Sequence, residues 1–275
     1  MSLSVNTNAG AMIALQYLNK TTSELTATQN HVNSGLKIAT AKDNGAIFAI
    51  AQNMRGDVSA FHAVSDSLNR AVSATDVAMN AGQAVSDLLV EMKGKAVAAA
   101  DVSLDTASRN ALNEDFESLR DQVTNILENA TFNGVNLVDG TSSSLTALVA
   151  ADGGSTITID GEDMSLDGSI VTVTDTDELD TAANASTLIT TINTSLENVN
   201  AALARLGSSS KQISIQNEFI GKLIDTLNGG IGNLVDADLA KESAMLQSLQ
   251  VKQQLGVQAL SIANSAPGIA LSLFR

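Results

Sequence analysis

The chain has no cysteine and no tryptophan, and only one tyrosine and one proline among its 275 residues. Without cysteine there is no disulfide framework, no thiol nucleophile and no thiolate metal ligand. The proline, Pro267, lies near the C-terminal end, so no earlier helix loses a backbone donor to a proline ring. The apolar residues are mainly Ala, Leu, Val and Ile, which favours long helices packed side by side over a globule with an aromatic centre.

Histidine is also scarce, which limits the chemistry the chain can perform. His31 and His62 are the only two, and neither belongs to an HExxH motif or to a pair with the spacing of metal ligands. No glycine-rich phosphate loop follows a predicted strand, and the acidic residues between 160 and 167 lack the pattern of a calcium-binding loop. We therefore expect no enzymatic activity, no cofactor and no metal site, and we interpret these acids as turn-forming surface residues, with a weak cation site as the alternative.

Basic residues are outnumbered, and the formal net charge is −15. A nucleic-acid partner is not expected, because phosphates require a basic surface. Residues 1–42 hold three lysines and one glutamate, and residues 241–275 hold two lysines, one arginine and one glutamate, so the other 28 acids lie between Asp43 and Asp238. No apolar run is long enough to span a membrane, and no signal peptide is indicated. This distribution predicts nearly neutral ends that are buried together and an acidic middle in water.

Both ends carry apolar side chains at alternating steps of three and four residues, the spacing of a coiled-coil seam. Polar residues interrupt each seam, Thr22 and Gln29 near the N-terminus and Gln253 near the C-terminus, so each helix should be marginal alone. The C-terminal segment is apolar on more than one side and needs several neighbours. We therefore predict a self-assembly interface formed by the two ends. Its predicted residues are Leu15, Leu18, Leu25, Val32, Leu36, Leu239, Leu246, Leu249, Leu255, Leu260, Ile262, Leu271, Leu273, Phe274 and Arg275.

Two glycine-bearing breaks separate these ends from the middle of the chain. The predicted connector residues are Gly35, Lys42, Asp43, Asn44, Gly45, Gly229, Gly230 and Gly232. Long seams with three and four spacing lie between the breaks and predict paired helices. The predicted core of these helices is formed by Ile47, Met54, Val58, Phe61, Leu68, Val72, Leu112, Phe116, Leu119, Val123, Ile126, Ile192, Leu196, Val199, Leu203, Leu206, Ile213, Ile220, Ile224 and Leu227.

A different composition begins at Asp139. Between Asp139 and Asp180 there are ten acids and no Lys or Arg, with strand-like alternation in 155–160 and 169–174. We interpret this stretch as a small β-rich lobe that faces solvent. The fold is thus predicted to be mainly α, a long antiparallel helical coiled-coil rod formed by the N- and C-terminal halves with the lobe inserted between them. The predicted boundaries are 1–42, 43–138, 139–187, 188–234 and 235–275.

Several motifs resemble the bacterial flagellin family. SVNTNAGAMIALQYLNKT (4–21) is similar to its amino-terminal motif, VNSGLKIATAKDNGAIFAIA (32–51) to its connector, and FNGVNL (132–137) to the turn that enters its outer region. VDADLAKES (235–243) and QALSIANSAPGIALSLFR (258–275) resemble its carboxy-terminal signature. The short middle resembles the short flagellins of alphaproteobacteria, and residues 139–187 match no family pattern, as in a variable outer region.

The resemblance implies a structural subunit of the extracellular flagellar filament, with 1–42 and 235–275 as inner, channel-lining helices. It implies unfolded export through the flagellar type III apparatus with an export chaperone, and addition at the distal tip beneath a cap, on filaments that begin at the hook-filament junction proteins. Two alternatives are a hook-filament junction protein and an exported coiled-coil effector or adhesin. Where many flagellins present an arginine-rich segment to a vertebrate toll-like receptor, this chain has VEMKGKAVA (90–98), so we expect weak or no receptor activation.

Overall fold

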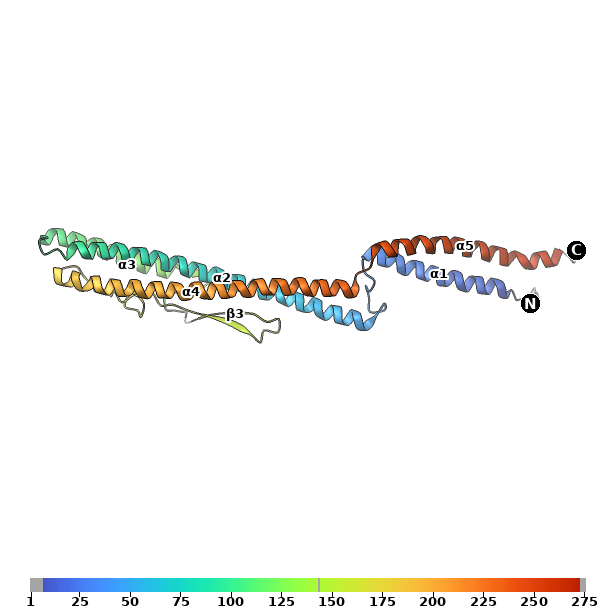
Figure 1. The fold of residues 1–275 in the computed structure, drawn as a ribbon, viewed down its shortest axis with the longest axis horizontal. Coiled ribbons are helices and arrows are strands. Elements are labelled where there is room, and N and C mark those ends of the chain that lie inside the picture. The colour runs from blue at the N-terminus through green and yellow to red at the C-terminus, as the bar shows by residue number, and fades with distance from the viewer. Residues whose placement is uncertain (1–6, 143, 273–275) are drawn as a thin grey trace. The chain divides into compact units, whose positions relative to one another are not determined.

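The computed structural model describes residues 7–142 and 144–272, and the predicted interface residues Leu273, Phe274 and Arg275 lie outside them. The elements run in the order α1 (Ala9–Ser34), α2 (Gly45–Ala99), α3 (Thr106–Asn129), β1 (Thr131–Phe132), β2 (Val135–Asn136), β3 (Ser144–Leu148), β4 (Thr156–Asp160), α4 (Ala182–Val235) and α5 (Leu239–Ser272) (Figure 1). The prediction of a mainly helical fold with paired ends and small β hairpins between them is confirmed.

The chain forms two compact units, which we call the terminal unit (1–56 and 226–275) and the central unit (57–225). In the terminal unit α1 and α5 lie side by side (Figure 1). They are antiparallel, because Leu18 lies against Gly256 while His31, further along α1, faces Glu242, which comes earlier in α5.

Polar side chains cap the N-terminal ends of the helices in the terminal unit. The Asn8 carboxamide accepts from Ala11 N at 3.0 Å at the start of α1, and the Asp238 carboxylate accepts from Ala240 N at 3.0 Å at the start of α5. Such side chains satisfy backbone donors that have no partner within the helix. The side chain of Asn44 accepts from Ile47 N at 3.1 Å and caps α2 in the same way.

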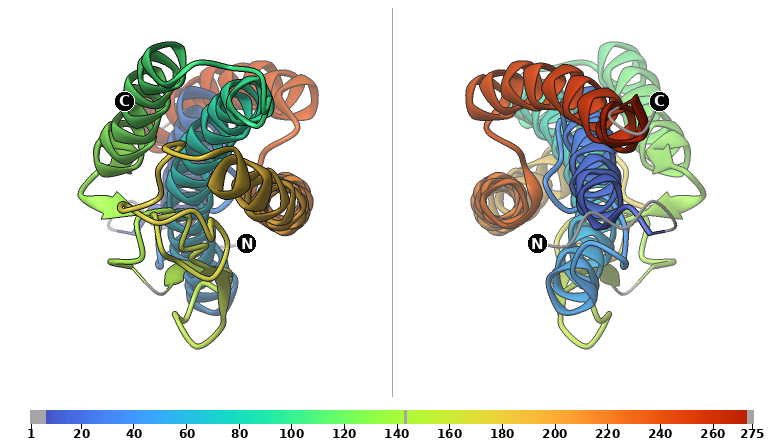
Figure 2. Two further views of the ribbon diagram at one scale, coloured as in Figure 1. Left: turned by 90° about the vertical axis from the view of Figure 1, so that its left-hand side faces the viewer. Right: turned by 90° about the vertical axis from the view of Figure 1, so that its right-hand side faces the viewer.

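The central unit is built around the part of α2 that it contains. The Ser65 hydroxyl donates to the Asn217 side chain at 2.7 Å, and Gly207 lies under Met79, so α2 and α4 pack antiparallel. α3 returns along α2, since the Arg109 guanidinium donates to Ala99 O at 3.0 Å and Lys95 pairs with Asp115. Figure 2 shows α2 and α3 beside each other in an end-on view.

One continuous apolar core fills the central unit. None of the predicted core residues within it is exposed, and Leu68, Phe116, Val123, Ile192, Val199, Leu206, Ile213, Ile220 and Ile224 are buried. The most buried row of α2 differs from the predicted seam and consists largely of small side chains: Val64, Leu68, Ala71, Thr75, Ala78, Gly82, Val85, Leu89, Met92, Ala96 and Ala99. Small residues allow the close approach of several neighbours, so a search for large apolar side chains found only part of this row, with Leu68 among the predicted core residues.

Two antiparallel hairpins follow α3. In the first, Asn133 and Gly134 occupy the turn between β1 and β2 with φ of 51° and 80°, a conformation that Asn and Gly tolerate. In the second, β3 pairs with β4 from Ser144↔Asp160 to Leu148↔Thr156. The predicted strand at 155–160 is therefore confirmed as β4.

The predicted strand at 169–174 is wrong. Its backbone is held by side chains of α4, because Ser195 Oγ accepts from Thr172 N at 2.9 Å and Asn198 donates to Ile170 O at 3.2 Å. Ile170 and Val171 are both buried, which breaks the alternation of a strand. The apolar pattern that suggested a strand instead packs this segment against a helix.

The second predicted glycine break also differs from the structure. Gly229, Gly230 and Gly232 lie inside α4, which continues to Val235 before the chain turns at Asp236. Gly230 lies close to Met54, since a Cβ there would be 3.0 Å from Met54 Cε. Gly230 therefore permits close packing on α2, and none of the three glycines ends the helix.

Candidate assembly surface

The segment that follows α1 and the segment that precedes α5 are hydrogen-bonded to each other. α1 ends at Ser34 and is capped by Gly35, whose φ of 72° suits a residue without a Cβ and whose N–H donates to His31 O at 2.8 Å. Beyond it, Lys37 N donates to Val235 O and Ala237 N to Gly35 O, both at 2.8 Å, and Leu36 pairs with Asp236. The two connectors thus hold the α1 and α5 ends together.

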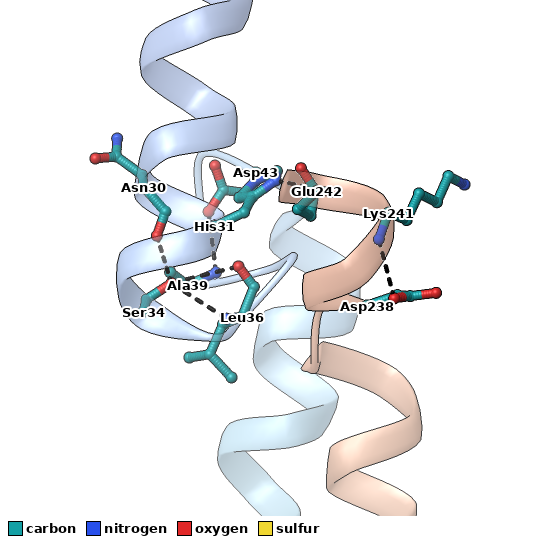
Figure 3. A network of polar contacts seen from close by, with 9 residues as sticks. All are labelled: Asn30, His31, Ser34, Leu36, Ala39, Asp43, Asp238, Lys241 and Glu242. Atoms are coloured by element: carbon teal, nitrogen blue, oxygen red, sulfur yellow. Dashed lines mark hydrogen bonds and ion pairs between the residues drawn. The ribbon is translucent and has the colours of Figure 1, made fainter. Parts of the chain in front are cut away.

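Asp43 orders the N-terminal connector. Its carboxylate accepts from Thr40 N at 2.9 Å, from Ala39 N at 3.1 Å and from the Thr40 hydroxyl at 3.1 Å. The hydrogen bond from the Thr40 backbone is the main cause that lowers the pKa of Asp43. The predicted connector residues Lys42, Asp43, Asn44 and Gly45 are exposed, and Figure 3 shows Asp43 beside His31.

The contact between α1 and α5 is narrow. Leu25 and Leu249 are the large side chains it buries among the described residues of the two helices, with Thr28 as a buried polar neighbour. Elsewhere the row uses small or polar groups: a Cβ on Gly256 would lie 3.2 Å from Leu18 Cδ1, and the Asn8 carboxamide donates to Ala263 O at 2.6 Å. Few apolar atoms leave water in this contact, so it supplies little stabilisation.

Much of the apolar surface of this pair faces solvent. Large exposed apolar side chains on the two helices are Met12, Ile13, Leu15, Tyr17, Leu239, Met245, Val251, Leu255, Val257 and Ile262. Soluble monomers rarely expose many large apolar side chains close together, so ten of them on two adjacent helices indicate an interaction site. The described part of the chain contains no helix that is both long and apolar enough to cross a membrane.

The predicted interface residues fall into two groups. Leu25 and Leu249 are buried in the α1–α5 contact, and Leu18, Val32, Leu36, Leu246 and Leu260 are half-buried. Leu15, Leu239, Leu255 and Ile262 are exposed, and Leu271 lies in the last turn of α5. The first group lies in or beside the contact of the helix pair, and Leu15, Leu239, Leu255 and Ile262 remain exposed to solvent.

Six further exposed apolar residues are absent from the predicted interface: Met12, Ile13, Tyr17, Met245, Val251 and Val257. The sequence analysis recognised that α5 is apolar on more than one side, but the predicted interface contains only some of the residues on the additional faces. The lack of a single polar face is the signal that points to the others.

A cleft of about 500 Å³ opens between α1 and α5 next to the connectors. Glu24, Thr28 and His31 line it from α1, and Glu242 and Met245 line it from α5. His31 Nδ1 is buried without a hydrogen-bond partner and lies 3.5 Å from Glu242 Oε1. No group of three side chains suited to a metal ion occurs in residues 7–142 and 144–272.

Comparisons with known proteins identify the family. Residues 5–143 match the bacterial flagellin N-terminal helical region, and residues 165–274 match the bacterial flagellin C-terminal helical region. The chain belongs to the bacterial flagellin family. It is 56% identical to flagellin FljK of Caulobacter vibrioides over 272 residues, which cover 99% of this chain and 98% of that protein. It is 35% identical to a flagellin of Brucella melitensis, covering 99% of each chain.

These relatives confirm the resemblance to alphaproteobacterial flagellins. A structure described as that of a flagellar hook-associated protein from Vibrio parahaemolyticus is similar with a TM-score of 0.61, 14% identity, and coverage of 70% of this chain and all of that one. At that identity the likeness shows the fold alone. As a flagellin, the chain is a non-enzymatic structural subunit that polymerises into the extracellular flagellar filament used for motility.

Proposed function

We propose that this flagellin polymerises through the exposed apolar faces of α1 and α5, with the central unit as a preformed folded body. The proposal rests on the incomplete burial of the two terminal helices. They contact each other along one narrow row and leave ten large apolar side chains exposed. When neighbouring copies cover this surface, each Å² of apolar area removed from water stabilises the assembly by about 25 cal/mol. Assembly thereby supplies the packing that the pair lacks in a single chain.

Ordering of these helices accompanies their addition to the filament. A marginal helix pair stays largely unpaired until partner surface is available, and the cost of ordering it is met when that surface is buried. Such coupling keeps free subunits soluble. It also confines growth to the filament end, where neighbouring helices are already in place.

The remaining partners follow from the same design. Export takes place in unfolded form through the flagellar type III apparatus with a chaperone, which is compatible with a chain that has no disulfide to break. Elongation begins on hook-filament junction proteins and continues beneath the cap at the distal tip. Activation of a vertebrate toll-like receptor is weak or absent, because the segment 90–98 lacks arginine.

A truncation tests the role of the terminal helices. A chain that ends at Leu246 keeps the central unit but lacks most of α5, including Leu249 and Leu255. Mixed with sheared filament fragments, it should fail to elongate them in electron micrographs, while circular dichroism still shows a cooperatively melting helical body. Filaments of normal length from this truncation would contradict the proposal.

A further inference from the structure

The terminal helices contain very few charges, and the acidic ones lie at one place. Glu24 is the only acidic residue in residues 1–42, and Glu242 is the only one in residues 239–275. Both line the cleft between α1 and α5 described above, whose other walls are mainly apolar. Acidic side chains are thus absent from the rest of α1 and α5.

The acids of the cleft are weakly engaged within the chain. Glu24 has only an exposed partner one turn away, with Lys20 Nζ at 3.9 Å, an arrangement of small energetic value. Glu242 faces His31 Nδ1 at 3.5 Å, and that nitrogen has no hydrogen-bond partner although it is buried. Lys241 lines the same cleft, but Figure 3 shows its side chain extending away from His31 and Glu242. The cleft therefore offers the partly exposed Glu242 carboxylate to a further donor.

Lys252 on α5 is a positive charge without an acidic partner among the described residues. Its side chain is exposed on α5 between Val251 and Leu255, two of the large exposed apolar residues. Within residues 7–142 and 144–272 it makes no hydrogen bond or ion pair. When neighbouring copies cover this apolar surface, the ammonium group loses water, and a buried charge requires a partner of opposite sign.

That partner does not lie on the same α5. Lys252 is ten residues from Glu242, about 15 Å along a helix at about 1.5 Å per residue, which is beyond the reach of a lysine side chain. We propose that the Lys252 side chain of one copy enters the α1–α5 cleft of a neighbouring copy and donates a hydrogen bond to the Glu242 carboxylate there. The aliphatic stem packs on the apolar walls of the cleft, and the charge of the ammonium group complements that of the carboxylate.

This pairing rests on the proposed function, since it assigns one specific contact to the interface of the terminal helices. It also gives that interface a register. Apolar surfaces alone tolerate sliding, whereas a buried ion pair is satisfied at one offset between copies.

Seeded elongation of full-length chains tests the pairing, with the free subunit concentration left at equilibrium as the readout. Lys252→Gln and Glu242→Gln should each raise this concentration about tenfold or more, as expected when one partner of a desolvated charge pair is removed. Lys211→Gln, at an exposed lysine of α4, is the matched control and should leave it unchanged. Lys252→Glu or Glu242→Lys alone should block growth, and the double variant Lys252→Glu/Glu242→Lys should restore it.

Circular dichroism of each free subunit checks that helix content is unaltered. Wild-type elongation by Lys252→Gln, or a double variant no better than the single ones, would overturn the pairing. Failure of the pairing and failure of the proposed function are distinguishable. If the terminal helices do not drive assembly, the chain that ends at Leu246 elongates filaments; if only the pairing is wrong, that truncation fails while Lys252→Gln grows normally.

Discussion

The terminal and central units contain the same types of apolar residue but bury them to different extents. In the central unit, helices and two hairpins surround α2, and large side chains such as Phe116, Met92 and Ile192 are fully buried. In the terminal unit, α1 and α5 contact each other along one row centred on Leu25 and Leu249. A helix with neighbours on several sides is stable within one chain, whereas a helix with one neighbour depends on other chains.

The largest difference is expected from core truncations. Phe116→Ala removes a fully buried side chain of the central unit and should lower the free energy of unfolding by about 3–5 kcal/mol, measured by urea denaturation of the free subunit. Leu249→Ala removes an equally buried side chain of the terminal unit. It should leave the urea midpoint of the main transition unchanged while sharply reducing seeded elongation. A comparable shift of the midpoint for both variants would contradict the division into two units of unequal stability.

A smaller effect is expected from added methyl groups. A Cβ on Gly82 would lie 2.8 Å from Leu203 Cδ2 and 3.2 Å from Met164 Sδ, so Gly82→Ala overpacks the core and should cost about 1–3 kcal/mol. Gly221, in α4, is the matched control because nothing lies within 4 Å of its Cβ position. Gly221→Ala should stabilise by about 0.5–1 kcal/mol through helix propensity. Thermal melting of the two variants compares them, and a stabilising Gly82→Ala would show that this contact is loose.

No response is expected in the third test, which concerns the outer surface of the central unit. In the segment 90–98 of α2, Glu91 is exposed and Lys93 is half-buried, and the segment contains no arginine. Purified protein should therefore give a toll-like receptor reporter signal far below that of a flagellin with an arginine-bearing segment. A response of equal potency would mean that recognition does not need the arginines.

The helices and the pairing of the chain ends could be predicted from the sequence, because the spacing of apolar residues shows that a helix buries one face whatever packs against that face. The long three and four spacing predicted helices, and the nearly neutral ends predicted that α1 and α5 lie together, although much of their surface is exposed in the single chain. The face that each helix presents to its neighbour was harder to predict. On α1, the predicted seam combined Leu18, Leu25 and Val32 with Leu15, Thr22 and Gln29, and the last three are exposed. The buried and half-buried row consists of Ala11, Ala14, Leu18, Thr21, Leu25, Thr28 and Val32. Two rows with the same spacing coexist on that helix, and small residues decide which one approaches its neighbour.

Pairing in the acidic lobe shows the same limit. Alternation identified β4, but its partner is β3 at Ser144–Leu148 rather than 169–174. Periodicity says that one face of a segment is buried and does not say what buries it. In the same way, the cleft with Glu24 and Glu242 brings together residues that are 218 positions apart in the sequence, and only the antiparallel pairing of α1 with α5 reveals it.

The central claim is that α1 and α5 are incompletely stabilised in a free subunit and are completed by neighbouring copies. Hydrogen exchange of the backbone amides, measured on free subunits and on filaments, tests it most directly. The account predicts rapid exchange throughout α1 and α5 in the free subunit, slow exchange in the parts of α2, α3 and α4 that form the central unit, and protection of α1 and α5 only in the filament. Equal protection of α1 and α2 in the free subunit would contradict it.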